Sequence, residues 1–263
     1  MADDLKLFLD QVRRRYARRR YLPSDPLSVV HRYDDPRDQE AVGFLAAGLA
    51  FGNVRSILAS LERALAPLGS RPASRLMRMG PRAAAAAAEG FNHRWVFAPD
   101  LAHVYRILGA ALREAGGLEP LFAAGASPDH EDVRPGAAAL LDGLRRLAPR
   151  DVDLQRRGTR YFLPEVRGVG AAKRLNMYLR WMVRRDAVDL GLWRQSARPA
   201  QLIVPLDTHI ARIGRRLGLT TRRTAGMAMA LGITRGLRAL DPRDPIKYDF
   251  ALARLGILRV CPM

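Results

Sequence analysis

Lys173 and Asp207 have side chains of types that can take part in catalysis. A neutral lysine amine can attack an electrophilic carbon and form a Schiff base. A carboxylate can stabilise a developing positive charge or accept a proton from the attacking group. Asp207 lies in the segment VPLDTHIARI, at the beginning of a predicted helix. An ordinary helix N-cap, worth about 1 kcal/mol, is the alternative role for this residue type at this position.

The segment LPEVRGVGAAK, residues 163–173, places a Gly-hydrophobic-Gly turn directly before another predicted helix. Such a turn leaves backbone N–H groups free to face an anion, and the helix dipole favours the same charge. Gly168 and Gly170 carry no Cβ, so a phosphate group can approach the backbone closely. The alternative interpretation is a tight turn that binds nothing.

The helix that follows the turn has an apolar face and a polar face. Its apolar residues have the i, i+3, i+4, i+7 spacing of a stripe that faces the core; they are Leu175, Tyr178, Leu179 and Met182. Its polar residues lie on a different face; they are Lys173, Asn176, Arg180 and Arg184. This polar stripe either lines a groove or meets solvent.

The charge of the chain favours a polyanionic partner. Lys and Arg number 44 against 26 Asp and Glu, which gives a formal net charge of +18. Between Val166 and Leu240 there are 15 Lys and Arg but three acidic residues. A GC-rich genome would raise the arginine content everywhere and would not concentrate it so strongly. We therefore expect a nucleic-acid-binding surface in this stretch.

The pairing of LPEVRGVGAAK with the downstream VPLDTHIARIGRRLGL resembles the helix-hairpin-helix DNA glycosylases. This likeness covers about half of the chain and implies that Gly168 and Gly170 form a hairpin that grips the DNA backbone. It further implies that Asp207 is the essential acid and that Lys173 is the candidate nucleophile. The wider chain, including RWMVRRDAVDLGLW and DPRDPIKYDFALARLGI, resembles a bacterial family described only as conserved and uncharacterised.

The resemblance also implies two further sets of site residues. Contacts to DNA are expected from the turn and from nearby basic residues, namely Arg167, Gly168, Val169, Gly170, Arg174, Arg180 and Arg212. The segment FLAAGLAFGNV, residues 44–54, resembles the part of these enzymes whose end meets a flipped base. The expected base pocket is formed by Phe51, Asn53, Trp181 and Asp249.

The chain departs from the glycosylase pattern in three ways. Lys173 lies three residues after Gly170, whereas the bifunctional enzymes usually place the lysine two residues after, at the site of Ala172. A shift of one residue rotates a side chain by about 100° on a helix. The 34-residue separation of Lys173 and Asp207 resembles the stretched spacing of the archaeal 8-oxoguanine glycosylases. The four-cysteine cluster of endonuclease III-like members is missing, because Cys261 is the only cysteine.

The elements that must position these residues are predicted to be helices, and the fold class is all-α. Helical periodicity, caps and prolines predict helices over residues 4–20, 37–51, 54–66, 98–115, 135–148, 173–184, 207–217, 224–240 and 246–257. The second of these is apolar nearly all round, so it should be central and buried. Residues 83–88 are an alanine run, and residues 121–135 are predicted to form a surface loop. We expect two lobes, about 35–130 and about 1–34 plus 131–263, with a helix-hairpin-helix motif and a cleft between them.

The expected function is removal of a damaged base from double-stranded DNA by base flipping, with an oxidised purine such as 8-oxoguanine favoured. If Lys173 is the nucleophile, the enzyme also has AP lyase activity; if water attacks, it only removes bases. The alternative is a non-catalytic helix-hairpin-helix module that recognises damaged or branched DNA. An RNA-binding protein would be expected to carry aromatic-glycine signatures that are missing here. A metal-dependent nuclease would need clustered carboxylates.

The remaining expectations concern location and partners. The N-terminus has no long apolar core of the secretory type, and no stretch approaches 18 apolar residues without charge. We therefore expect a cytoplasmic monomer that binds DNA and no membrane. No cofactor and no metal are expected.

Overall fold

The computed structural model describes residues 2–257 of the chain, and Cys261 lies outside them. About 60% of the chain is helical. The one sheet in the described part consists of two strands. The predicted all-α fold is therefore confirmed. No helix between residues 2 and 257 combines the length and apolar character needed to cross a lipid bilayer.

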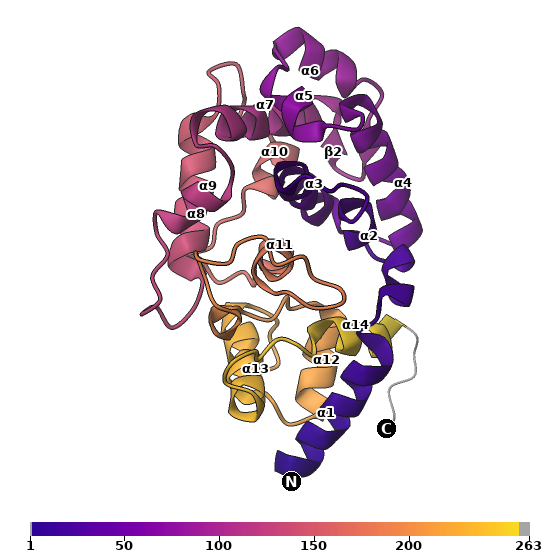
Figure 1. Cartoon of the computed structure of the whole chain (residues 1–263), viewed down its shortest axis with the longest axis vertical. Coiled ribbons are helices and arrows are strands. Elements are labelled where there is room, and N and C mark those ends of the chain that lie inside the picture. The colour runs from indigo at the N-terminus through magenta and orange to yellow at the C-terminus, as the bar shows by residue number, and fades with distance from the viewer. Residues whose placement is uncertain (1, 258–263) are drawn as a thin grey trace. The chain divides into compact units, whose positions relative to one another are not determined.

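The chain divides into two compact units (Figure 1). Unit 1 contains the residues up to Leu22, Pro128–Arg134 and the residues from Glu165 onwards. Unit 2 contains Pro23–Ser127 and Pro135–Pro164. The expected lobes differ from these units at residues 23–34 and 135–164, which belong to unit 2, and at residues 128–130, which belong to unit 1.

The helices of unit 1 are α1 (Ala2–Tyr16), α11 (Lys173–Val183), the 3-10 helix η3 (Pro199–Gln201), α12 (Thr208–Arg216), α13 (Met227–Leu240) and α14 (Asp249–Ile257). A further 3-10 helix, η1 (Arg19–Ser24), lies where unit 1 passes into unit 2. Helix α14 contacts both α1 and α12, so the two ends of the chain share one unit (Figure 1).

The elements of unit 2 are α2 (Leu27–Val30), α3 (Pro36–Leu49), α4 (Val54–Leu65), η2 (Ala66–Leu68), α5 (Pro72–Met77), α6 (Pro81–Ala87), β1 (Asn92–His93), β2 (Val96–Phe97), α7 (Ala98–Glu114), α8 (Glu119–Ala123), α9 (Arg134–Leu147) and α10 (Arg157–Phe162). Strands β1 and β2 form a hairpin in which Asn92 pairs with Phe97.

Helix α3 is the buried helix that the sequence predicts. The Asp35 side chain caps it by accepting from the Arg37 N–H at 2.8 Å, and Pro36 begins it. All residues from Glu40 to Ala50 are buried. Glu40 accepts from the N–H groups of Leu118 and Glu119, both at 2.8 Å, so this buried carboxylate binds the beginning of α8.

Helix α9 contacts the side chains of α8 through two of its glycines. A Cβ on Gly136 would come within 2.7 Å of the Phe122 ring, and one on Gly143 within 2.9 Å of Leu121. The close approach therefore requires residues without side chains at these two positions. The helical periodicity of a single segment contains no information about such a contact.

Candidate functional site

Lys173 and Asp207 are brought together in unit 1. The Lys173 Nζ lies 3.7 Å from the Asp207 Oδ2, an ion pair between residues that are 34 positions apart in the sequence. The side chain of Lys173 is 37% exposed and that of Asp207 is 21% exposed. The pair is thus accessible to a ligand from solvent and is partly shielded from water, which strengthens its electrostatics.

Asp207 is held in place by the helix that it caps. Its backbone is extended, and its Oδ1 accepts a hydrogen bond from the Ile210 N–H at 2.8 Å. Ile210 and Ile213 anchor α12 in the core of the unit. One carboxylate oxygen is therefore fixed by the helix N-terminus, while the other faces the ammonium group of Lys173. Both sequence interpretations of Asp207, cap and partner of Lys173, are compatible with this geometry.

Lys173 follows a residue in a strained backbone conformation. Ala172 has φ 44° and ψ 40°, the left-handed region, which costs roughly 1–2 kcal/mol for a residue with a Cβ. The Asn176 side chain donates to the Ala171 carbonyl at 2.9 Å, and the Asn176 N–H donates to the Ala172 carbonyl at 3.0 Å. These bonds hold the turn in place. Because Ala172 precedes the helix, the first helical side chain is Lys173, and it reaches Asp207.

Asp249, which the sequence analysis expected in a base pocket, is a buried carboxyl beside this pair. It begins α14, is 3% exposed and accepts a hydrogen bond from the Arg180 Nη1. Burial raises the pKa of Asp249 to about 6; the Arg180 guanidinium opposes this rise and the negative charge of Asp207 adds to it. Asp249 therefore interacts electrostatically with Asp207 from inside the unit.

Arg180 belongs to a buried network of arginines and aspartates, which corrects the expectation that it contacts DNA. Its residue exposure is 4%, and its guanidinium binds both Asp189 and Asp249. Arg184 is equally buried and binds Asp189 and two further carboxylates. These two are Asp186 and Asp244. Beyond the first turn of α11, the residues of its polar stripe are thus buried. They bind α11 to the segments around residues 186–189 and 244–249.

The glycine turn before α11 is exposed. Val169 at its tip is 91% exposed, and Gly168 and Gly170 are exposed as well. Neither glycine has a positive φ, and a Cβ on Gly170 would meet nothing within 4 Å. The Val169 carbonyl accepts from the Met227 N–H at 2.9 Å, which ties the turn to the beginning of α13. The fold itself therefore gives no steric reason for a glycine at position 170.

The other expected DNA contacts of unit 1 lie at its surface. Arg167 and Arg212 are exposed, and Arg174 is half-buried. A pocket of about 570 Å³ adjoins the tip of the turn. Its basic lining residues are Arg134, Arg222 and Arg223. Apart from the buried Arg180, the expected contacts therefore occupy positions that a ligand can reach.

The remaining residues of the expected base pocket are Trp181 in unit 1 and Phe51 and Asn53 in unit 2. Trp181 is fully buried, so its ring faces cannot stack on a base, and this expectation is corrected. Its Nε1 has no hydrogen-bond partner in the described part of the chain. Asn53 caps α4 by accepting from the Ser56 N–H at 2.9 Å, and Phe51 lies in an aromatic cluster that includes His93, Trp95 and Tyr161.

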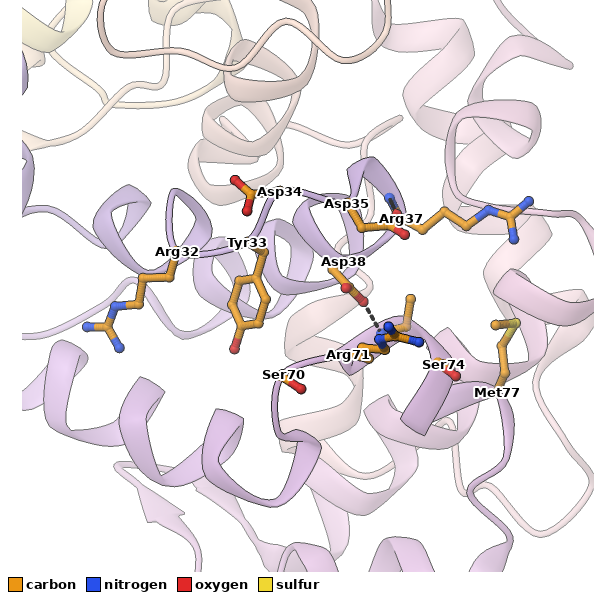
Figure 2. A pocket seen from close by; sticks show the side chains of 11 residues that line it. Arg32, Tyr33, Asp34, Asp35, Arg37, Asp38, Ser70, Arg71, Ser74 and Met77 are labelled. Carbon is orange, nitrogen blue, oxygen red and sulfur yellow. Dashed lines mark hydrogen bonds between the residues drawn. The ribbon is translucent and has the colours of Figure 1, made fainter.

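Unit 2 contains a polar pocket that the sequence analysis did not anticipate. It has a volume of about 760 Å³ and is lined by charged residues and small polar ones. Figure 2 shows Asp38 directed toward the segment that carries Arg71. The buried Asp38 accepts there from the Ala73 N–H at 2.6 Å, and burial raises the pKa of its carboxyl. None of the expected site residues lines this pocket.

Residues 2–257 hold no group of three or more His, Cys, Asp or Glu side chains arranged to bind a metal ion.

Comparison with known proteins gives one family: a family model described as "Protein of unknown function (DUF2400)" matches residues 25–258. No curated protein matches the chain, and no solved structure matches it.

Proposed function

The chain belongs to the DUF2400 family, and we propose that this member is a DNA glycosylase that removes a damaged base from double-stranded DNA. The observation that carries the proposal is the 3.7 Å approach of the Lys173 Nζ to the Asp207 Oδ2, directly after an exposed glycine turn. An amine and a carboxylate in this relation suit covalent catalysis at a sugar carbon. The stretched spacing of the two residues favours an oxidised purine as the base.

The proposed chemistry uses the two side chains in sequence. The Lys173 ammonium first loses a proton, which the Asp207 Oδ2 can accept. The amine then bonds to the sugar carbon C1′ while the bond from C1′ to the base nitrogen breaks, and the base leaves with the electron pair and takes up a proton. Asp207 passes its proton to the departing base, and the carboxylate that results stabilises the positive charge that develops on the sugar. The C1′–O4′ bond then breaks, O4′ takes up the proton that the attached nitrogen loses, and the protonated Schiff base that forms allows β-elimination of the 3′ phosphate. Attack by water instead of the amine would release only the base.

The glycine turn supports the DNA-binding half of the proposal. Neither a positive φ nor a close contact inside the protein requires a glycine at position 170. This glycine can therefore serve a close contact with an external ligand. The backbone of the turn is exposed and lies immediately before α11. A phosphate group could approach it without meeting a Cβ. The exposed arginines nearby supply the positive charge that a DNA backbone requires.

The second candidate is a non-catalytic module that binds damaged or branched DNA with the same turn. The observation that favours it is the double role of Asp207, which already caps α12 and needs no catalytic task to account for its position. This candidate predicts that the Lys173–Asp207 pair is a structural ion pair.

The substitution Asp207→Asn separates the two candidates. Asparagine is also a good N-cap, so α12 should persist. An enzyme should lose base release from lesion-bearing duplexes by at least about tenfold while its affinity for DNA changes little, since a tenfold change corresponds to about 1.4 kcal/mol of barrier. A module should show no base release in either form.

The matched control is Asp35→Asn, which makes the same change at the N-cap of α3 in unit 2. Base release should persist in this variant. Equal loss in both variants would indicate that a cap, and not a catalytic carboxylate, had been removed. Retention of full activity in Asp207→Asn would contradict the proposed role.

A further inference from the structure

Unit 2 carries a cluster of aromatic rings at its surface. The Phe51 ring stacks on Trp95 with centroids 4.7 Å apart and an interplanar angle of 24°. Tyr161 packs edge-on against both rings, at 4.7 Å from Phe51 and 5.1 Å from Trp95. All three residues are partly exposed to solvent. Rings that serve only the core are normally covered, so this cluster retains an aromatic surface that a ligand can reach.

A buried histidine holds the cluster in place. The His93 Nε2 donates to the Phe51 carbonyl at 3.0 Å, and its Nδ1 accepts from the Ser60 hydroxyl at 2.9 Å. Burial lowers the pKa of His93, so the ring is neutral and suits this donor and acceptor pattern. Phe51 and the β1–β2 hairpin are therefore joined rigidly, and the Phe51 ring contacts His93 edge-on at 4.5 Å.

The tip of the hairpin has a strained backbone. Arg94 has φ 55°, a region that favours glycine, and it lies next to Trp95. Gly52 has φ 104°, and a Cβ there would come within 2.9 Å of the Arg94 Nε. Arg94 thus extends over the backbone that follows Phe51. Strained residues that the surrounding structure holds in place tend to occur at binding sites.

Two arginines add positive charge to the aromatic surface. The Arg157 guanidinium carbon lies 5.1 Å from the centroid of the Trp95 ring, a cation–π contact. Neither Arg94 nor Arg157 takes part in an ion pair within the described part of the chain. Partly exposed rings combined with unneutralised guanidinium groups are complementary to a nucleobase and its phosphate. An apolar protein partner would leave these charges without a counterpart.

We propose that the aromatic surface formed by Phe51, Trp95 and Tyr161, together with Arg94 and Arg157, stacks on an unpaired base of a DNA strand. A base inside an intact duplex does not expose its ring face, so the surface discriminates in favour of bulged or locally opened DNA. This inference rests on the proposed function only in taking DNA as the ligand. It requires no chemistry at Lys173.

Tryptophan fluorescence of the whole protein tests the proposal directly. Trp181 and Trp193 are fully buried, whereas Trp95 is partly exposed, so a change on ligand binding reports on the cluster. The probes are a duplex with one unpaired nucleotide, the fully paired duplex of the same length, and single-stranded DNA and RNA of the same sequence. We expect emission to be quenched by the bulged duplex and by single-stranded DNA, and much less by the paired duplex.

The variant Trp95→Ala should lose about tenfold in affinity for the bulged duplex, equivalent to about 1.4 kcal/mol, and little for the paired one. Trp95→Phe keeps an aromatic face and should retain most of this preference. The matched control is Phe97→Ala, because Phe97 is exposed in the same hairpin but makes no ring contact with the cluster.

Several outcomes would overturn the proposal. They are equal binding of bulged and paired duplexes by the wild-type protein, unchanged fluorescence with every DNA probe, or a stronger response to RNA. If the wild-type protein shows the Trp95 fluorescence response but releases no base, only the proposed glycosylase activity is contradicted. If it releases a base without that fluorescence response, only the proposed stacking surface is contradicted.

Discussion

Arg180 and Asp249, which are 69 residues apart, form a buried ion pair that joins α11 to the beginning of α14. The pair lies close enough to Asp207 for the charge of that carboxylate to raise the pKa of Asp249 further. The site therefore has a buried carboxyl with a raised pKa beside the partly exposed Lys173–Asp207 pair.

The raised pKa of Asp249 predicts a specific pH dependence of stability. The pKa of Asp249 is about 6 in the folded protein, whereas in the unfolded chain this carboxyl has its ordinary pKa of 3.8. Wild type should therefore lose stability relative to Asp249→Asn as the pH rises from 4 to 6, by about 1–3 kcal/mol, and the difference should level off above pH 6. Urea unfolding of both proteins at several pH values measures this. A difference that does not vary with pH would contradict the assignment.

The burial of Arg180 predicts a structural role. Arg180→Met leaves Asp189 and Asp249 without a shared buried cation and should destabilise the protein by about 3–5 kcal/mol. The exposed Arg212 is the matched comparison on α12. Arg212→Gln should leave stability within about 0.5 kcal/mol of wild type. The slope of the logarithm of DNA affinity against the logarithm of salt concentration should also fall by about the contribution of one phosphate contact. A stable Arg180→Met protein with weakened DNA binding would reverse these assignments.

The open space above Gly170 predicts that this glycine serves ligand binding. Gly170→Ala should change unfolding free energy by less than about 0.5 kcal/mol, because the added Cβ meets no protein atom. It should weaken DNA binding by about tenfold, since the Cβ stands where a phosphate would approach.

Gly48→Ala provides the opposite control. Its Cβ would come within 2.2 Å of the Phe162 ring, so it should destabilise unit 2, while folded molecules still bind DNA. If Gly170→Ala kept the DNA affinity of the wild-type protein, the glycine turn would not contact the DNA backbone.

The left-handed conformation of Ala172 predicts that the lysine cannot be moved to the position usual in the glycosylases. The double variant Ala172→Lys with Lys173→Ala places the amine on a residue that precedes α11, away from the direction in which the Lys173 side chain leaves the helix. We expect no base release and no covalent adduct from this variant. Recovery of wild-type activity would show that the position of the amine relative to Asp207 matters less than its presence.

Much of unit 1 could be predicted because local rules determine it. The helix predicted over residues 207–217 is α12, Thr208–Arg216, and that predicted over 173–184 is α11, Lys173–Val183. In both cases an apolar stripe marks the length of the helix. At α12, the side chain of Asp207 also marks the beginning.

Other features depend on residues that are far apart in the sequence and could not be predicted locally. Arg180 has the spacing of a solvent-facing residue, and only the arrival of Asp189 and Asp249 makes its burial favourable. Strands β1 and β2 contain two residues each, too few to show alternation. The resemblance of residues 44–54 to the glycosylases implies that Phe51 contacts a base, but it does not imply the stacking of Phe51 on Trp95, because these residues meet only through the hairpin.

Borohydride trapping on lesion-bearing duplexes tests the catalytic role of the Lys173–Asp207 pair most directly. Wild-type protein should form a covalent adduct with a duplex that carries an oxidised purine, and Lys173→Gln should form none while still binding the DNA. An adduct that persists in Lys173→Gln, or the lack of both adduct and base release with every lesion tested, would contradict the account.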